Sequence, residues 1–575
     1  MLLTRLHELI TTPTAKTSRG QMIFWFCLSL TFALIYAWLG LRKAFDGEYV
    51  VQDDARQHVF WMVRFLDPQL FPNDLIADYF QSVAPAGYTS IYRLAAAAGI
   101  NPLFFNKLLP PVLGLIVTGY CFGLCLEIFP IPAAGFVATL LFNQQMGFKD
   151  DIISATPRAF AYPLLLAFLY YLLRGKLWQT LGAIALLGLF YPQVLLLCAL
   201  ILVLRLLDWE NGKLGFSQRR SDYIFCAAGL GVTFLILLPF ALNTSEYGPA
   251  ITVAEAKTLP EFWPTGRSSF FNENLAKFFI VGGRSGMFPK AILTPVTLCV
   301  GLLLPLLLAF SRRFPLVKQL GSGIKILPQM LLASIALFSA AHALLFKLHL
   351  PSRYTGYSLR VIIVLASAIA FTTILDALLK WAQQGTFPRK IIAWVTVAIV
   401  SISLLCYPSF VKSFPRNSYK HGKLPELYQF FSQQPKDILI ASVAGEADLL
   451  PSFTQRSVLV AREYAIPYQL GYYRQFRQRL LDLVRAQYSP DLAEVQKFIQ
   501  TYGVDFILLD PGALTPEYIS SRRQRWIIEM QPAQAAIDNM KQGKTPALAK
   551  VINSCQAFQT QGMVVLDANC ILNQS

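Results

Sequence analysis

The most regular feature of the sequence is a series of apolar stretches separated by short polar ones. A helix needs about 20 apolar residues to cross the hydrocarbon core of a bilayer. Apolar stretches recur along the first 410 residues, at about 22–41, 108–128, 133–143, 157–173, 178–207, 223–242, 291–310, 326–346, 358–379 and 391–407. The pattern predicts a polytopic α-helical membrane protein.

The stretch 178–207 decides the topology, because Phe190-Tyr191-Pro192-Gln193 interrupts its apolar residues. It can form two short spans that meet at an outer turn, or one tilted or kinked span, since membrane helices tolerate proline. With two spans, all later basic loops are cytoplasmic, as the positive-inside rule requires. Those loops contain Lys213, Arg219, Arg220, Arg312, Arg313, Lys318, Lys325, Lys380, Arg389 and Lys390. We therefore predict about 11 spans, with the N-terminus inside and the C-terminus outside.

Polarity divides the chain into three predicted parts. Residues 1–21 are a cytoplasmic tail, residues 22–410 contain the spans with large external loops at 42–107 and 243–290, and residues 411–575 turn polar. The elements predicted in the last part are helices 424–431 and 492–502 and strands 437–443, 457–461 and 504–509. This alternation of helices and strands is typical of an α/β domain, here extracytoplasmic.

The composition supports a membrane protein and excludes two other classes. The chain is 55% hydrophobic and 14% charged, with a mean hydropathy of +0.46, whereas soluble domains have about 25% charged residues. A net charge of +17 would suit a nucleic-acid partner, but the basic residues collect in short loops between apolar stretches. The first apolar stretch lacks a small-residue cleavage site, so we predict a retained span and not a signal peptide.

Two of the nine cysteines, Cys555 and Cys570, lie in the polar region. The other seven lie in or beside apolar stretches, where cysteine behaves as a small core residue. Because residues 411–575 are predicted to lie outside, where oxidation is permitted, we predict a disulfide between Cys555 and Cys570.

Carboxylate pairs occur at two membrane boundaries that the topology places on the outer face. Asp53-Asp54 follow the first span, Asp150-Asp151 lie between the third and fourth spans, and Arg353 lies in the turn before the tenth. Charged residues so close to a membrane need partners, water or a metal, and they suggest a functional site.

Each of these residues also has a structural interpretation. Asp53 can cap the helix that follows it, Asp150-Asp151 can cap a turn, and Arg353 can anchor the chain at the interface. Arg158 can contact a donor phosphate or simply pair with Asp150. The aromatic, amphipathic run 59–66 is predicted to lie in the membrane interface.

Two acidic loops and an arginine at one face suit transfer from a phosphate-linked donor. Arginine binds phosphate through two parallel hydrogen bonds, and a carboxylate accepts the proton of the acceptor hydroxyl. We predict Asp54 as this base, since Asp53 is the better-placed helix cap. A divalent cation such as Mg²⁺ or Mn²⁺, held by Asp54 and Asp151, would stabilise the leaving group.

With these residues the chain resembles the GT-C-fold glycosyltransferases, the superfamily of protein O-mannosyltransferases, aminoarabinose transferases and oligosaccharyltransferase subunits. The resemblance rests on the two acidic motifs, the Arg353-Tyr354 turn and the C-terminal external α/β domain. It implies a polyprenyl-phosphate-linked sugar donor. It further implies Asp53 or Asp54 as the first-loop catalytic acid, Asp150 or Asp151 as the second acidic motif, and Arg353 as the donor-phosphate contact.

The sequence departs from the family patterns at three places. Gln52-Asp53-Asp54 is not the Asp-Glu pair of O-mannosyltransferases, and Lys149-Asp150-Asp151 is not the Asp-x-Asp or Glu-x-Asp of oligosaccharyltransferases. Residues 411–575 contain no Trp-Trp-Asp motif, which argues against recognition of a peptide sequon. These departures leave the metal dependence open.

The sequence therefore predicts a plasma-membrane glycosyltransferase that moves a sugar from a polyprenyl-phosphate-linked donor to an extracytoplasmic lipid, glycan or protein acceptor. A transporter or flippase is the first alternative, but it would place charges near the midplane and use internal repeats. A non-catalytic membrane assembly protein is the second. Sugar transfer by the purified protein would distinguish the enzyme from both.

Overall fold

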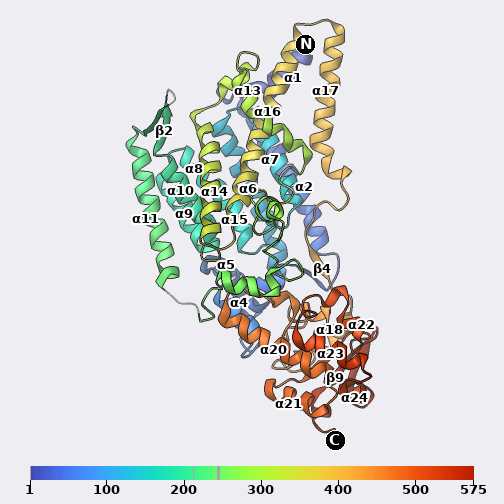
Figure 1. Ribbon diagram of the computed structural model, residues 1–575. Coiled ribbons are helices and arrows are strands. Elements are labelled where there is room, and N and C mark those ends of the chain that lie inside the picture. Colours follow the sequence, from blue (N-terminus) through green and yellow to red (C-terminus); the bar gives the residue numbers. More distant parts are fainter. Residues whose placement is uncertain (1, 211–212, 243–245, 575) are drawn as a thin grey trace.

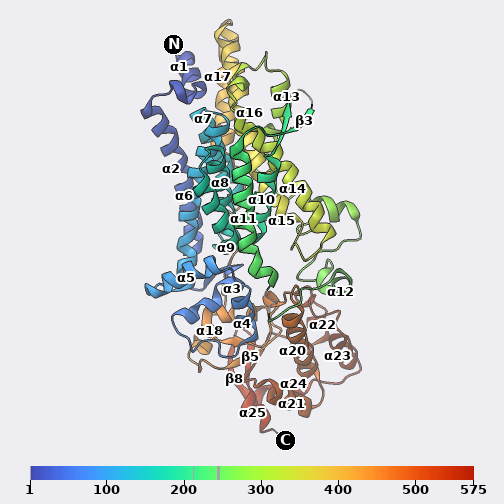
Figure 2. The same ribbon diagram turned by 90° about the vertical axis from the view of Figure 1, so that its left-hand side faces the viewer.

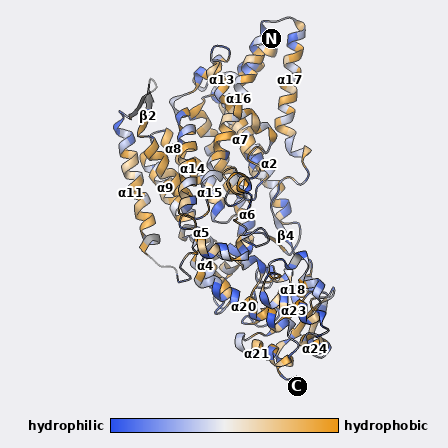
Figure 3. Ribbon diagram, viewed as in Figure 1, coloured by the Kyte–Doolittle hydropathy of each residue, from blue (hydrophilic) through white to orange (hydrophobic). Residues whose placement is uncertain are grey.

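The computed structural model describes residues 2–210, 213–242 and 246–574. The predicted loop positions 211–212 and 243–245 and the terminal residues 1 and 575 lie outside the described residues. The chain forms a bundle of helices with an α/β part at one end, and the two termini lie at opposite ends of the molecule (Figures 1 and 2). Apolar residues dominate the bundle and polar residues the α/β part (Figure 3).

Among the described residues, six helices of the bundle are long and apolar enough to cross a membrane. They are α2 (Arg19–Ala44), α6 (Pro102–Ile128), α11 (Arg220–Leu242), α14 (Ile326–Ala343), α16 (Ser358–Gln383) and α17 (Phe387–Cys406). The other predicted spans form shorter helices, namely α7 (Pro132–Gly147), α8 (Ala161–Leu173), α9 (Leu177–Phe190), α10 (Pro192–Leu204) and η6 (Val296–Leu303) followed by α13 (Leu304–Ala309). Each predicted span thus contains a helix, and the number that cross the membrane stays a prediction.

The interrupted stretch after α8 forms two helices, α9 and α10. α9 ends at Phe190 because Pro192, two residues on, has no N–H group to extend it. Phe190 lies against Gly87 of the first loop, whereas Arg205, just past the end of α10, pairs with Asp222 at 3.0 Å. The charge pattern predicted this turn between two helices.

The helix α16 forms the centre of the bundle and packs against η6, α7 and α14. Most of its side chains are buried. In contrast, α11 and α17 lie at the edges (Figure 1), and their exposed residues include Phe234, Leu235, Ile399 and Ile402. Exposed apolar faces of this kind suit contact with lipid.

Residues 1–18 and the loops at the same end of the bundle contain short elements. These are α1 (Leu2–Thr11), η1 (Thr14–Lys16), the hairpin β2 (Leu207–Glu210) and β3 (Lys213–Phe216), η7 (Pro315–Gln319) and η8 (Ser322–Lys325). Lys325 pairs with Asp208 at 2.6 Å, which joins the hairpin to the start of α14.

The first large loop folds into five short elements, β1 (Val50–Gln52), α3 (Ala55–His58), η2 (Phe60–Phe65), α4 (Leu75–Ser82) and α5 (Ala86–Ala97). The prediction that residues 59–66 lie in the membrane interface is wrong. Phe60, Trp61 and Met62 are at most 1% exposed, and the Phe60 ring contacts Phe71 and Tyr464. The aromatic pattern therefore reflects burial between the loop and the C-terminal part, because protein instead of lipid covers the apolar side chains.

The second large loop contains α12 (Val253–Thr258), η4 (Pro260–Phe262) and η5 (Lys277–Val281). Its Phe262 and Phe270 pack with Phe346 and with Leu470 of the C-terminal part. This small apolar core fixes the loop between the bundle and the α/β part.

The C-terminal part contains a five-stranded sheet in the order β6-β5-β7-β9-β8. The strands are β5 (Leu439–Ala441), β6 (Ser457–Val458), β7 (Phe506–Leu509), β8 (Gln556–Thr560) and β9 (Met563–Asp567). Both β6 and β7 pair with β5 in parallel, whereas β9 pairs with β7 and β8 in antiparallel orientation. The chain thus adds strands first on one side of β5 and then on the other.

Helices connect and surround these strands. The α-helices of the C-terminal part are α18 (Pro425–Ser432), α19 (Leu450–Thr454), α20 (Leu470–Tyr488), α21 (Leu492–Tyr502), α22 (Pro516–Ile519), α23 (Gln531–Lys541), α24 (Ala547–Cys555) and α25 (Ala568–Leu572). The short helix α15 (Ser352–Gly356) lies in the bundle, directly before α16. The 3-10 turns are η9 (Tyr407–Phe410), η10 (Gly445–Asp448), η11 (Arg462–Tyr464) and η12 (Arg522–Gln524). A disulfide joins Cys555 to Cys570 with the Cα atoms 5.4 Å apart.

The orientation of the bundle can be tested by labelling two exposed basic positions at its opposite ends. We expect a membrane-impermeant maleimide added to intact cells to modify a Lys420→Cys variant and to spare Arg219→Cys, because the positive-inside rule places Arg219 in the cytoplasm. Permeabilised cells should label both variants, and the unsubstituted protein corrects for native thiols. The reverse pattern in intact cells would invert the topology.

Candidate active site

The first acidic motif follows a strand that the C-terminal part completes. β1 pairs in antiparallel orientation with β4 (Tyr419–His421), so that Val51 lies opposite Lys420. The Gln52 side-chain oxygen then accepts hydrogen bonds from the N–H groups of Asp54 (2.8 Å) and Ala55 (3.3 Å). The prediction that Asp53 caps the following helix is therefore wrong, since Gln52 satisfies these donors.

The two neighbouring aspartates point to different partners. The Asp54 carboxylate lies 2.6 Å from Nη2 of Arg158, whereas Asp53 pairs with Arg56 and, at 3.5 Å, with Lys420. Although they are adjacent in sequence, the two carboxylates thus belong to separate clusters.

Arg158 joins the first acidic motif to the second. Besides Asp54, its guanidinium group lies 3.1 Å from Asp150 and 3.5 Å from Asp151. Arg158 belongs to η3 (Pro157–Phe160), at the start of α8. Three carboxylates that the sequence places on one face therefore converge on one cation. We call Arg158 with Asp54, Asp150 and Asp151 the Arg158 cluster.

Hydrogen bonds to the backbone hold the loop with the second motif in place. The Tyr92 hydroxyl donates to the carbonyl of Ala155 at 2.8 Å, and the Asn106 amide donates to the carbonyl of Ser154 at 2.8 Å. Tyr92 and Asn106 are both buried. These two hydrogen bonds fix the backbone directly after Asp150 and Asp151.

The charges around Asp151 favour its ionised form. Burial alone would raise its pKa, but Arg158, Lys149 and Arg360 outweigh burial, so that the pKa of Asp151 lies below its usual value. Asp54 and Asp150 are the more accessible carboxylates of the cluster, with side chains 27% and 24% exposed against 8% for Asp151. A substrate can therefore reach Asp54 more easily than Asp151.

Arg353 lies in α15 with its guanidinium group poorly satisfied. Its Nε is buried and has no hydrogen-bond partner within the described chain. No carboxylate of the described residues lies within ion-pair distance of it. Such a partly buried cation without a carboxylate partner is suited to an anionic ligand.

Arg284 adds a second cation beside Arg353. The Ser352 N–H donates to the Arg284 carbonyl at 3.3 Å, and the Arg284 side chain donates to the backbone carbonyls of Arg267 and Ser269. Burial, then the proximity of Arg353 and Arg284, lowers the pKa of His349 to about 3. The sequence analysis did not single out Arg284, although a cation in the external loop 243–290 was a visible signal.

No group of three or more His, Cys, Asp or Glu side chains in the described parts of the chain could hold a metal ion. Asp54, Asp150 and Asp151 offer the oxygen ligands that Mg²⁺ and Mn²⁺ prefer. Their oxygens, however, surround the Arg158 guanidinium group, which occupies the place that an ion bridging them would need.

Arg158 should contribute to stability as well as to the site. An Arg158→Gln substitution leaves three carboxylates facing one another without their shared cation, and we expect it to lower the free energy of unfolding by about 3 kcal/mol. Thermal unfolding in detergent micelles measures the change. Arg174→Gln is the matched control, because its 3.5 Å pair with Glu127 is exposed and exposed ion pairs contribute little to stability. Equal melting temperatures for both variants would contradict this role.

Comparison with known proteins identifies the fold. No protein-family profile and no curated protein matches the sequence. Among solved structures, 88% of the chain superposes on 72% of the archaeal oligosaccharyltransferase AglB from Archaeoglobus fulgidus, in complex with an inhibitory peptide and a dolichol-phosphate, with a TM-score of 0.55 and 12% identity.

A second structure of the Archaeoglobus fulgidus oligosaccharyltransferase, in complex with Zn and sulfate, matches 87% of the chain and 69% of its own length, with a TM-score of 0.50 and 12% identity. ArnT from Cupriavidus metallidurans, in the apo state, matches more loosely, with a TM-score of 0.43 and 12% identity over 96% of this chain and 99% of ArnT. At 12% identity the two oligosaccharyltransferase matches establish the fold and not the reaction. The resemblance seen in the sequence is confirmed at this level: the chain has the GT-C fold.

Proposed function

We propose that the protein is a membrane glycosyltransferase that moves a sugar from a polyprenyl-phosphate-linked donor to an extracytoplasmic acceptor. The observation that carries this proposal is the juxtaposition of acids and cations on one face. Asp54 is held by Arg158 in an accessible position, and Arg353 and Arg284 lie nearby without an ion pair to any carboxylate of the described residues. AglB, which has the same fold, was solved with a dolichol-phosphate, and a lipid phosphate is the kind of anion that these arginines would bind.

The residues divide the chemistry of transfer between them. The acceptor hydroxyl attacks the anomeric carbon of the donor sugar, the bond from that carbon to the phosphate oxygen breaks, and polyprenyl phosphate leaves. Asp54 accepts the hydroxyl proton. Arg353 and Arg284 stabilise the negative charge that develops on the leaving phosphate, as positioned cations do in other transfer reactions.

Arg158 acts on Asp54 and not on the donor in this scheme. The sequence left open whether Arg158 contacts a donor phosphate or pairs with the acids, and its three ion pairs favour the second role. Asp150 and Asp151 position Arg158, which in turn fixes the direction of the Asp54 carboxylate. The donor-phosphate role stays with Arg353, and Arg284 joins it.

We propose that Arg158 provides the charge that a divalent cation between the acidic motifs would provide. We therefore expect EDTA to leave the transfer rate of the purified protein unchanged, and added Mg²⁺ or Mn²⁺ to have no effect after extensive chelation. Sugar transfer from the polyprenyl phosphate is the measurement. If EDTA abolishes transfer and Mg²⁺ or Mn²⁺ restores it, the proposal that Arg158 replaces a divalent cation is wrong. Such a result would favour a metal held by Asp54 and Asp151.

The two neighbouring acids should differ in their contribution to the rate. Asp54→Asn removes the base without removing a cap, because Asp54 makes no side-chain capping bond, and we expect a loss of about 100-fold or more in transfer. Asp53→Asn should lose less. The assay follows radiolabelled sugar from polyprenyl phosphate to an endogenous acceptor extract.

Asp67→Asn is the control for this comparison, since Asp67 is an exposed acid of the same loop and pairs with Lys436. It should transfer sugar at the wild-type rate. Wild-type rates for Asp54→Asn, or a larger loss for Asp53→Asn, would reject Asp54 as the base. Absence of transfer by the wild-type protein would favour the transporter or assembly interpretation.

A further inference from the structure

A large open cavity lies where the first loop, residues 260–267 and the C-terminal sheet meet. Its volume is about 810 Å³. Five carboxylates line it, namely Asp53, Glu446, Asp448, Glu463 and Asp510. It is separate from the Arg158 cluster, but Asp53 borders it and is followed directly by Asp54. The cavity thus borders the residue that directly precedes the proposed base.

The cavity lies at the position where open α/β sheets bind ligands. It contains Glu446, which follows β5, and Asp510, which follows β7. These strands are parallel neighbours, and the direction in which the chain adds strands reverses between them. Ligands of such sheets bind beyond the carboxyl ends of the strands at this reversal.

The chemistry of the lining indicates a ligand rich in hydroxyl groups. Five basic residues also face the cavity, Arg56, Arg267, Lys420, Lys423 and Arg462, and Leu449 is the only aliphatic residue among those that line it. The five acids offer hydrogen-bond acceptors and the five bases offer donors. Because their charges balance, the lining has no excess of positive charge that would favour a strongly anionic ligand. Sugar hydroxyls both donate and accept hydrogen bonds, whereas acyl chains and most peptides require apolar contacts.

Two of the carboxylates are already oriented by tyrosine hydroxyls. Tyr428 donates to Glu446, and Tyr518 donates to Asp510 at 2.5 Å. Burial, and then the nearby Asp510, raises the pKa of Glu446 to about 7. At neutral pH Glu446 therefore exists in both forms, and it can accept from or donate to a hydroxyl group.

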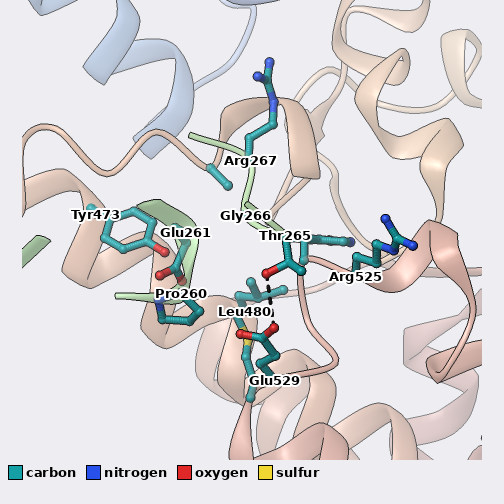
Figure 4. A pocket seen from close by; sticks show the side chains of 12 residues that line it. Pro260, Glu261, Thr265, Gly266, Arg267, Tyr473, Leu480, Arg525 and Glu529 are labelled. Atoms are coloured by element: carbon teal, nitrogen blue, oxygen red, sulfur yellow. Dashed lines mark hydrogen bonds between the residues drawn. The ribbon is translucent and has the colours of Figure 1, made fainter. Parts of the chain in front are cut away.

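One wall of the cavity is fixed by several polar contacts. Arg267 binds Glu463 at 2.7 Å, while Thr265 donates to Glu529 at 3.1 Å and Glu261 lies 3.6 Å from Arg477. Figure 4 shows Thr265 facing Glu529 in a tight neighbouring pocket and Arg267 projecting away from it. The segment 260–267 thus separates the tight pocket from the open cavity.

A chain of contacts connects this wall to the proposed donor site. The Arg284 guanidinium group donates to the carbonyl of Arg267 at 3.4 Å, and the Arg284 carbonyl accepts from Ser352, the residue before Arg353. The cavity and the two arginines of the donor site therefore border on the same segments of chain.

We propose that this cavity binds the acceptor and that the acceptor is a carbohydrate. The inference rests on the proposed glycosyltransferase function and names its acceptor class. Glu446, Asp510 and Lys423 hydrogen-bond to sugar hydroxyls, and the acceptor chain extends from there toward Asp54.

The test measures saccharide binding by the full-length protein in nanodiscs. The probes are tetrasaccharides of mannose, glucose and N-acetylglucosamine, detected by saturation-transfer NMR, with a serine- and threonine-containing hexapeptide as the competing class. We expect at least one tetrasaccharide to bind and the peptide not to bind. Glu446→Gln, Asp510→Asn and the exposed Lys423→Gln should each weaken binding about tenfold, because each loses a hydrogen bond from a charged group.

Glu494→Gln is the matched control, since Glu494 is exposed on α21 and does not line the cavity, and it should bind saccharides like the wild type. Circular dichroism of each variant confirms folding, and Lys423→Gln removes an exposed side chain that the fold does not need. No saccharide binding by the wild type, binding of the peptide in its place, or equal binding by all variants would overturn the inference.

Donor affinity, measured on the same wild-type sample with a polyprenyl-phosphate-linked sugar, tests the proposed function separately. Donor binding without saccharide binding would reject only the carbohydrate acceptor. Saccharide binding without donor binding would reject the glycosyltransferase function and leave the cavity as a carbohydrate site.

Discussion

The ion pairs of Arg158 unite the parts of the site that come from distant segments of the chain. The first loop contributes Asp54 and the loop after α7 contributes Asp150 and Asp151, and each carboxylate lies within 3.5 Å of the same guanidinium group. Bringing three acids together at a membrane face is costly unless a cation compensates them. Arg158 supplies that compensation from within the protein, and the direction of the Asp54 side chain follows from it.

The second constraint is the short pairing of β1 with β4. Three residue pairs join the first loop to the C-terminal part directly before Asp53. Asp53 and Asp54 follow this strand in a turn, and the two adjacent aspartates serve different clusters. Asp54 faces the bundle loops with Arg158, while Asp53 faces the cavity with Arg56 and Lys420.

Sequence patterns predicted the helices and pointed to the acidic residues, but they did not predict that Asp53 and Asp54 belong to separate clusters. Apolar length and basic loops predicted a helix at every proposed span, since both signals are local in sequence. The pairing of β1 with β4 and the packing of Phe60 against Tyr464 join segments that lie about 370 and about 400 residues apart in the sequence, which no local pattern encodes. Arg284 escaped notice for the same reason, because its importance comes from its contact with Ser352 and not from its neighbours in sequence.

The pairing of β1 with β4 also bears on how such proteins can be recombined. The backbone beside the proposed base is half of a two-stranded ribbon whose other half belongs to the C-terminal part. A chimera that exchanges residues 419–575 for those of a related protein would therefore exchange the support of Asp54 as well. The unit that can be inherited or engineered intact includes residues 50–58 together with the C-terminal part, although about 360 residues of membrane bundle separate them along the chain.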